Sequence, residues 1–350
     1  TNVVHDLELM RQVLTGDQDL NFLGSSYGTT IAAMYITMFP EHSGRITLDS
    51  PTTNDNQSDA DAIIQAKALE AKIMHYVDGY AKAKGKTREQ VKRILLKIRQ
   101  WGDDNKLTGF AGMKSIGSTG LRVSNESVFT HGMFALTYWD DATAQEYFNQ
   151  AIDELLGPNH YNGIFEYVGF SLDGYDPESL AGKEYDPSNI VRDNSYEIMD
   201  MVNSIDRDLR EQRSHEESDA LSKKIERVSP FWTALNSDAS QFTWHDDREG
   251  AYWSWLAFDD KNIPDPPKEM PARTNDSGKQ FLVIGSQHES TTPYTFSVRT
   301  AKDLQSPLVT YLGSEHAALA GFTHSCLNAI FIQYMVSDSL PKDVASCPAD

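Results

Sequence analysis

LNFLGSSYGTTIAAMYITMFP, residues 20–40, joins an apolar segment, a glycine-flanked turn and a second apolar segment. The first segment, residues 20–23, predicts a strand, and the second, residues 29–39, has the spacing of a helix that ends at a proline. The turn between them has the pattern G-x-S-x-G, residues 24–28. In that pattern the serine occupies a strained backbone turn, and its small flanking residues let the turn pass close to neighbouring chain.

Ser26, the serine of this turn, is the candidate nucleophile. The strand and the helix raise it above the edge of a sheet, and the amide of Tyr27 then points to the place where an oxyanion forms. Two other interpretations are a simple tight turn between strand and helix, and a loop that binds phosphate. The phosphate loop is disfavoured because the Gly-Lys-Ser/Thr ending and the GxGxxG spacing are both missing.

A serine hydroxyl becomes nucleophilic when a histidine accepts its proton and a carboxylate holds that histidine in one tautomer. With this kind of turn, the order along the chain is serine, acid, histidine. Glu289 follows the predicted strand 280–285, and His316 follows the predicted strand 306–313. These two residues are the candidate acid and base. Asp49, at the end of RITLD, is the alternative acid, and its other role would be to cap the turn SPTT.

The order of predicted elements indicates an α/β fold. Strand, turn, helix and a further strand over residues 20–49 form the start of a parallel α/β unit. The alternation stops over residues 54–278 and resumes with the two late strands and a closing helix over 324–341. The predicted organisation is therefore a core of four strands made of residues 1–53 and 279–350, interrupted by a helical cap over residues 54–278.

The cap region is predicted to be helices joined by polar loops. Its aromatic clusters, residues 129–139 and 250–258, fit either packing between helices or the lining of an acyl pocket. A proline-rich linker is predicted over residues 261–278. The helical spacing covers residues 59–83, 87–101, 143–157 and 195–228.

The composition excludes several classes of function. The formal net charge is −20, from 51 acidic and 31 basic residues, which disfavours nucleic acid as a partner. No apolar run approaches the roughly 18 residues of a membrane span. The two cysteines, with no HExxH or CxxC pattern, give no support for a metal site, and no cofactor is expected.

The chain resembles the α/β-hydrolase superfamily, and within it the secreted actinobacterial tripeptidyl and prolyl aminopeptidases. The resemblance rests on LNFLGSSYGTTIA, on RITLDSP, and on FLVIGSQHESTTPYTF followed by YLGSEHA. It implies Ser26 as nucleophile, His316 as base and Glu289 as acid, although the family usually has aspartate at the acid position. It also implies a disulfide between Cys326 and Cys347, and hence a secreted or cell-surface protein.

In one respect the chain departs from this family. The family has several strands before the first helix of this sequence, together with a glycine-rich loop that supplies the second oxyanion amide. We therefore expect an N-terminal segment of the same precursor to complete the sheet and the oxyanion hole, since a core of four strands leaves one sheet edge open.

Three functional hypotheses follow from the sequence. The first is a serine exopeptidase that releases short peptides or amino acids from peptide N-termini. The second is a carboxylesterase or lipase that uses the same triad on small or lipid-like esters, because fold and triad do not define the leaving group. The third is a binding protein that keeps the scaffold without catalysis, which the retention of both serine and histidine disfavours.

Overall fold

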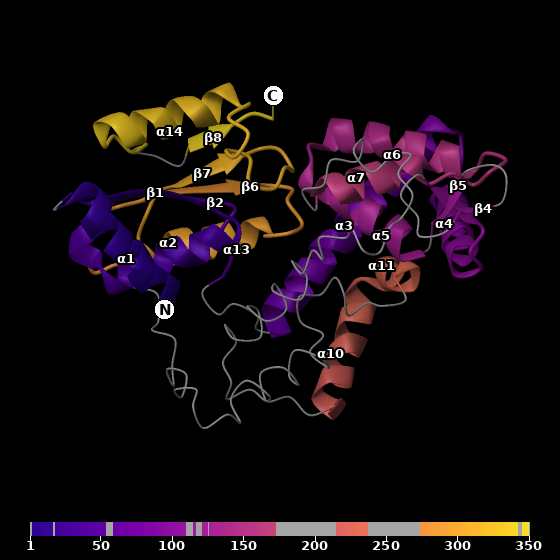
Figure 1. The fold of residues 1–350 in the computed structure, drawn as a ribbon, viewed down its shortest axis with the longest axis horizontal. Helices are drawn as coiled ribbons and strands as arrows, with labels where there is room; N and C mark the ends of the chain where they lie inside the picture. The colour runs from indigo at the N-terminus through magenta and orange to yellow at the C-terminus, as the bar shows by residue number, and fades with distance from the viewer. Residues whose placement is uncertain are drawn as a thin grey trace. The chain divides into compact units, whose positions relative to one another are not determined.

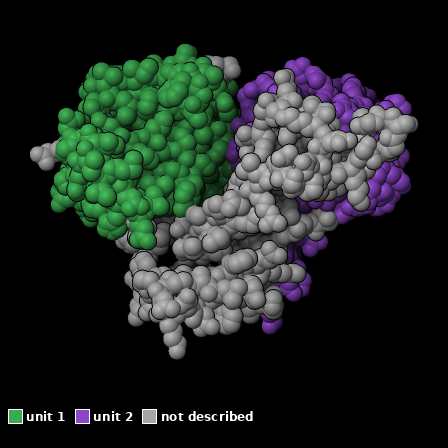
Figure 2. All heavy atoms as spheres, viewed as in Figure 1, with its two compact units in different colours: residues 1–65, 206–211, 256–350 green, residues 66–205, 212–255 purple. Residues whose placement is uncertain are grey.

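The computed structural model describes residues 2–16, 18–53, 59–109, 115–116, 121–124, 126–172, 215–236, 274–341 and 345–349. The chain divides into two compact units (Figure 2). Unit 1 contains residues 1–65, 206–211 and 256–350, and unit 2 contains residues 66–205 and 212–255. The first segment of unit 1 thus ends at residue 65, inside a long helix. The sequence predicted that this segment of the core would end at residue 53, twelve residues earlier.

Unit 1 is built on a parallel sheet of five strands in the order β1-β2-β6-β7-β8. The sequence predicted four of these strands. The fifth, β8, has three residues, too few to show a period of two in the sequence. The strands are β1 (Leu20–Ser25), β2 (Ser43–Asp49), β6 (Leu282–Ser286), β7 (Leu308–Tyr311) and β8 (Ala345–Cys347).

Helices cover both faces of this sheet (Figure 1). On one face lie α1 (Asn2–Thr15), α2 (Tyr27–Met38) and α13 (Tyr294–Asp303), and on the other lies α14 (Ser325–Ser337). A short 3₁₀ helix, η1 (Pro40–His42), leads into β2. Side chains of β6 alternate between the two cores: Val283 packs with the first layer, whereas Leu282 and Ile284 pack with the second. Burial on both faces explains why this strand is a continuous apolar run.

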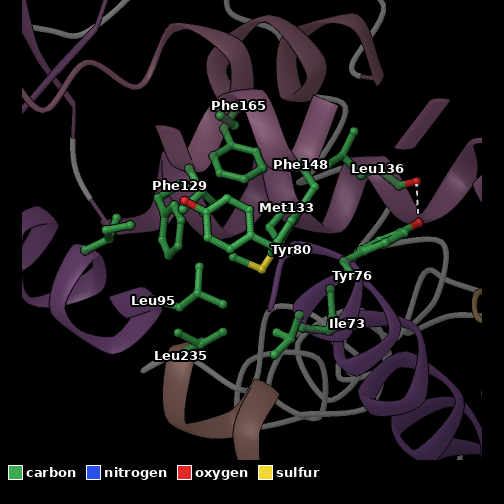
Figure 3. Close-up of a cluster of buried hydrophobic side chains, with 14 of the residues drawn as sticks. Ile73, Tyr76, Tyr80, Leu95, Phe129, Met133, Leu136, Phe148, Phe165 and Leu235 are labelled. Carbon is green, nitrogen blue, oxygen red and sulfur yellow. Dashed lines mark hydrogen bonds between the residues drawn. The ribbon is translucent and has the colours of Figure 1, made fainter. Parts of the chain in front are cut away.

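Unit 2 is mainly helical, and its core is a cluster of aliphatic and aromatic side chains (Figure 3). In this cluster the hydroxyl of Tyr76 donates to the carbonyl of Leu136 at 3.2 Å. The elements are α3 (Asp59–Ala83), whose first seven residues belong to unit 1, α4 (Arg88–Asp103), α5 (Glu126–Ala135), η3 (Leu136–Tyr138), α6 (Asp141–Leu155), α7 (Gly163–Leu172), α10 (His215–Val228) and α11 (Pro230–Leu235).

Three helices of this region lie where the sequence predicted them. The fourth predicted helix, 195–228, is described only from residue 215, as α10. Residues 195–214, most of the predicted linker (261–273) and the aromatic cluster 250–258 lie outside the described residues. The other aromatic cluster, 129–139, forms α5 and η3, where Phe129 and Phe134 are buried in the core of the unit.

Unit 2 also contains a small antiparallel sheet, which the sequence did not predict. Its strands are β3 (Leu107–Gly109), β4 (Ser115–Ile116) and β5 (Leu121–Ser124), in the order β3-β5-β4. Strands of two to four residues are too short to carry an alternating pattern, so the sequence predicts a polar loop here.

No helix in the described part of the chain is both long enough and apolar enough to cross a membrane.

The disulfide implied by the resemblance is present: Cys326, in the first turn of α14, is bonded to Cys347 in β8, with Cα atoms 5.6 Å apart.

Candidate active site

Ser26 lies in a sharp turn between the end of β1 and the start of α2. Its backbone angles, φ 52° and ψ −124°, fall in a region that residues with a side chain seldom adopt. The turn requires glycine two residues earlier, because a Cβ on Gly24 would lie 2.4 Å from the carbonyl oxygen of Gly28. A Cβ on Gly28 itself would meet nothing within 4 Å. The first glycine of the G-x-S-x-G pattern is therefore a steric necessity, and the second is not.

Tyr27 is the first residue of α2. Its amide consequently belongs to the positive end of the helix dipole, where partial positive charge from the backbone stabilises anions. Ser26 is partly exposed, and the side chain of Tyr27 is exposed as well. This environment suits an oxyanion that develops next to the serine.

The structure brings Glu289 and His316 together. Nδ1 of His316 donates a hydrogen bond to Oε1 of Glu289, and the two side chains are 7% and 0% exposed. The bond assigns the ring proton to Nδ1, so that Nε2 is the proton acceptor of the neutral ring. Glu289 follows β6 by three residues and His316 follows β7 by five, as the predicted chain order requires.

Further donors fix the carboxylate of Glu289. Oε1 accepts from the amide of Thr292 at 3.1 Å and from its hydroxyl at 2.6 Å. Oε2 accepts from the hydroxyl of Ser50 at 2.9 Å. A buried carboxylate needs such partners to remain charged. Thr292 and Ser50 carry no local sequence signal for this role, although both belong to segments that follow strands ending at the same sheet edge.

Asp49, the alternative acid, has a different set of contacts. Its Oδ2 accepts from the amide of Leu319 at 3.0 Å, and its Oδ1 has no hydrogen-bond partner within the described ranges. Burial raises the pKa of Asp49 to about 7; the Leu319 amide opposes this shift, and the charge of Glu289 adds to it. The turn role suggested by the sequence is thus replaced by a bond to the loop that carries His316.

The pKa of His316 is raised above its ordinary value. Burial lowers this pKa, but the charge of Glu289, the hydrogen bond to it and the charge of Asp49 together raise it by more. A histidine with a raised pKa is a stronger base, and that is the property that removal of a hydroxyl proton requires.

The sheet register relates Ser26 to this pair. Ser25 pairs with Asp49, Asp49 pairs with Ile284, and Ile284 pairs with Val309. Since the strands are parallel, the segments that follow them emerge at one edge, where ligands bind in open α/β sheets. The amide of Ser26 donates to the carbonyl of Asp49 at 3.0 Å. Ser26 is thereby fixed to the same β2 terminus that bonds to the loops of Glu289 and His316.

Three of the eight described residues that have positive φ without being glycine lie at this edge. Ser26, Ser50 and Ala317 have φ values of 52°, 53° and 55° without being glycine. Such conformations cost of order 1 kcal/mol or more each and cluster at functional sites.

In the part of the chain that the structure describes, no group of three or more His, Cys, Asp or Glu side chains is arranged to hold a metal ion.

Comparison with known proteins agrees with this fold. Residues 248–347 match the model of a family described as TAP-like protein. The match covers 100 of the 350 residues, and the parallel sheet and the serine turn agree with it, so the chain is similar to TAP-like α/β-hydrolases. The resemblance drawn from the sequence is confirmed.

Individual relatives are distant. The chain is 23% identical over 359 residues to the serine protease Hip1 of Mycobacterium tuberculosis, covering 99% of this chain and 61% of that protein. It is 30% identical over 118 residues to a tripeptidyl aminopeptidase of Streptomyces lividans, covering 32% of this chain and 22% of the relative. It is 27% identical over 129 residues to carboxylesterase B of M. tuberculosis, covering 37% and 22%. The chain spans about three fifths of the length of Hip1.

Proposed function

We propose that the protein is a serine exopeptidase acting on peptide N-termini. The Oγ of Ser26 attacks the scissile carbonyl carbon while Nε2 of His316 takes the hydroxyl proton. His316 then gives that proton to the leaving amine as the C–N bond breaks, and water hydrolyses the acyl-enzyme by the same route. Glu289 holds the imidazole throughout and stabilises its protonated form.

One observation carries this proposal: the strained turn of Ser26 and the bonded pair His316–Glu289 follow strands that end at the same sheet edge. The distant homology to a serine protease and to a tripeptidyl aminopeptidase supports a peptide substrate. The net charge of −20 favours a substrate with a free, positively charged amino terminus.

We further propose that an N-terminal segment of the same precursor completes the sheet and supplies the second oxyanion amide. Among the described strands, β1 pairs only with β2, so its other edge is available. In α1, next to this edge strand in sequence, Leu9, Val13 and Leu14 are exposed. Additional chain covering these groups would bury apolar surface and pair the open edge. The disulfide supports a secreted or cell-surface location.

Carboxylesterase activity is the second candidate. It is favoured by the likeness to carboxylesterase B and uses the same residues. The aromatic residues that could line an acyl pocket argue less for it, because Phe129 and Phe134 are buried in the core of unit 2.

A substrate panel on the intact protein separates these candidates. Fluorogenic tripeptidyl and aminoacyl amides are compared with short and long acyl esters, and Ser26→Ala is the control. We expect the amides with a free amino terminus to be preferred, and we expect a fluorophosphonate probe to label the protein only when Ser26 is present. A higher kcat/KM for esters would favour the esterase, and absence of labelling of the folded protein would favour a binding scaffold.

A further inference from the structure

We propose that Ser50 is a positioning residue, whose hydroxyl keeps the carboxylate of Glu289 and the backbone beside His316 at a fixed separation. The inference rests on the proposed function, because alignment of acid and base matters only if His316 acts as the base. Ser50 is the first residue after β2 and is fully buried.

The hydrogen bonds of the Ser50 hydroxyl have one possible direction. The amide of Ala317 can only donate, and it lies 2.9 Å from Oγ of Ser50. The hydroxyl oxygen must therefore accept from Ala317, which leaves its single hydrogen for Oε2 of Glu289 at 2.9 Å. The chain of bonds runs from the backbone next to His316, through Ser50, to the acid.

The backbone of Ser50 is fixed as firmly as its side chain. Its amide donates to the carbonyl of Ile284 at 3.0 Å, and its carbonyl lies 3.1 Å from the hydroxyl of Thr292, which shares its one hydrogen between this carbonyl and Oε1 of Glu289. These bonds tie the residue to β6 and to the loop that carries Glu289. They also explain how Ser50 keeps φ at 53°, a conformation that surrounding structure must enforce in a residue other than glycine.

The side chains of Asp49 and Thr292 each form a hydrogen bond to one of the two loops that carry His316 and Glu289. Oδ2 of Asp49 bonds to the amide of Leu319 in the His316 loop, and the hydroxyl of Thr292 bonds to Glu289 in its own loop. Ser50 joins the two loops through one atom. Other bonds also join these loops: the amide of His288 donates to the carbonyl of Gly313 at 3.0 Å, and the hydroxyl of Ser286 donates to the carbonyl of Glu315 at 2.6 Å. The Ser50 bond differs from them because it reaches the carboxylate of Glu289 itself, and small misplacement of reacting groups is costly in rate.

The test uses Ser50→Gly and Ser50→Ala in the intact protein. Both remove the hydroxyl, and the glycine variant also relieves the strain at φ 53°, so it remains informative if the alanine variant fails to fold. Ser290→Ala and Ser314→Ala are matched controls. Their hydroxyls are buried in the Glu289 and His316 loops and have no hydrogen-bond partner within the described residues.

We expect kcat to fall about 10- to 100-fold in both Ser50 variants, with KM within about twofold of the wild type. A second readout is the downfield proton resonance of Nδ1 of His316, assigned by its loss in His316→Gln. We expect this resonance to shift or broaden in the Ser50 variants and to be unchanged in the two controls. If the role of Ser50 were purely structural, its loss would lower the melting temperature but would leave the Nδ1 proton resonance of His316 unchanged.

Unchanged kcat together with an unchanged resonance in folded Ser50→Gly would overturn the inference, as would an equal loss of kcat in the controls. Failure of the proposed function looks different: the wild-type protein itself would then show no labelling that depends on Ser26. The resonance can still be measured in that case, since it reports on geometry and not on turnover.

Discussion

Glu289 accepts a hydrogen bond from Nδ1 of His316, although the family that the sequence resembles usually has aspartate at this position. The longer side chain is accommodated because Thr292 and Ser50 bind its two oxygens and fix its direction. Asp49, the competing carboxylate, is engaged by Leu319. This geometry favours Glu289 as the acid, and it makes the choice between the two carboxylates testable.

Glu289→Gln and Asp49→Asn form a matched pair for that choice. Glutamine keeps the shape of the side chain but removes the charge that stabilises the imidazolium and selects its tautomer, so we expect kcat to fall about 10³- to 10⁴-fold. For Asp49→Asn we expect a loss of about tenfold or less, because asparagine can still accept from the Leu319 amide. Steady-state kinetics on one substrate give both numbers. The reverse ranking of the two variants would make Asp49 the acid.

The pH dependence of kcat/KM reports on His316. Only the neutral ring can take the serine proton, so activity rises with pH through the pKa of this histidine. Because that pKa is raised, we expect the rising limb above pH 6.5, the ordinary value for histidine. In Glu289→Gln the limb should move to lower pH, since the neighbouring negative charge is lost. Rates of fluorophosphonate labelling between pH 5 and 9 give the pH profile of the wild-type protein and of Glu289→Gln. If the two profiles rose at the same pH, this account would be contradicted.

Gly24→Ala tests the steric requirement of the turn. The new Cβ would lie 2.4 Å from a backbone oxygen, so the turn must move, and we expect a loss of about 1–3 kcal/mol in the free energy of unfolding. Gly28→Ala is the control: its Cβ meets nothing and lies in α2, where alanine is preferred to glycine by up to about 1 kcal/mol. Urea unfolding of both variants provides the comparison. Equal effects would mean that the close approach is not what restricts position 24.

Asp49 should make stability depend on pH. Its folded pKa of about 7 lies above the unfolded value of about 3.9, so the native state keeps a proton that the unfolded chain releases. The resulting stabilisation is complete below about pH 4 and is lost as pH rises through 7. Asp49→Asn lacks this contribution, so its stability relative to the wild type should improve between pH 5 and pH 8. Urea unfolding at both values measures the change, and a difference that does not vary with pH would refute it.

The sequence predicted the parts of unit 1 that have strong local patterns. The turn at Ser26 was found because its motif requires a strand before it and a helix after it, and both are present. Glu289 and His316 were predicted as acid and base from the order of strands along the chain, and the structure places their side chains in contact. The strands β3, β4, β5 and β8 were missed, because their two to four residues carry no detectable period.

Ser50 was missed for a different reason. In the sequence it begins SPTT, which has the composition of a turn, and nothing local indicates that its hydroxyl meets a residue 239 positions later. The left-handed conformation of Ser50 and Ala317 is equally invisible, since both residue types normally avoid it. Roles that depend on contacts between distant loops appear only once the sheet has brought those loops together.

The covalent link between Cys326 and Cys347 connects the shortest strand of the parallel sheet to the first turn of α14. Three residues of ladder are weak by themselves, and segments with few contacts open locally at low free energy. We therefore expect the disulfide to keep β8 paired with β7. In a reducing compartment we expect β8 to separate from the sheet. The edge strand would then be β7, which leads to His316.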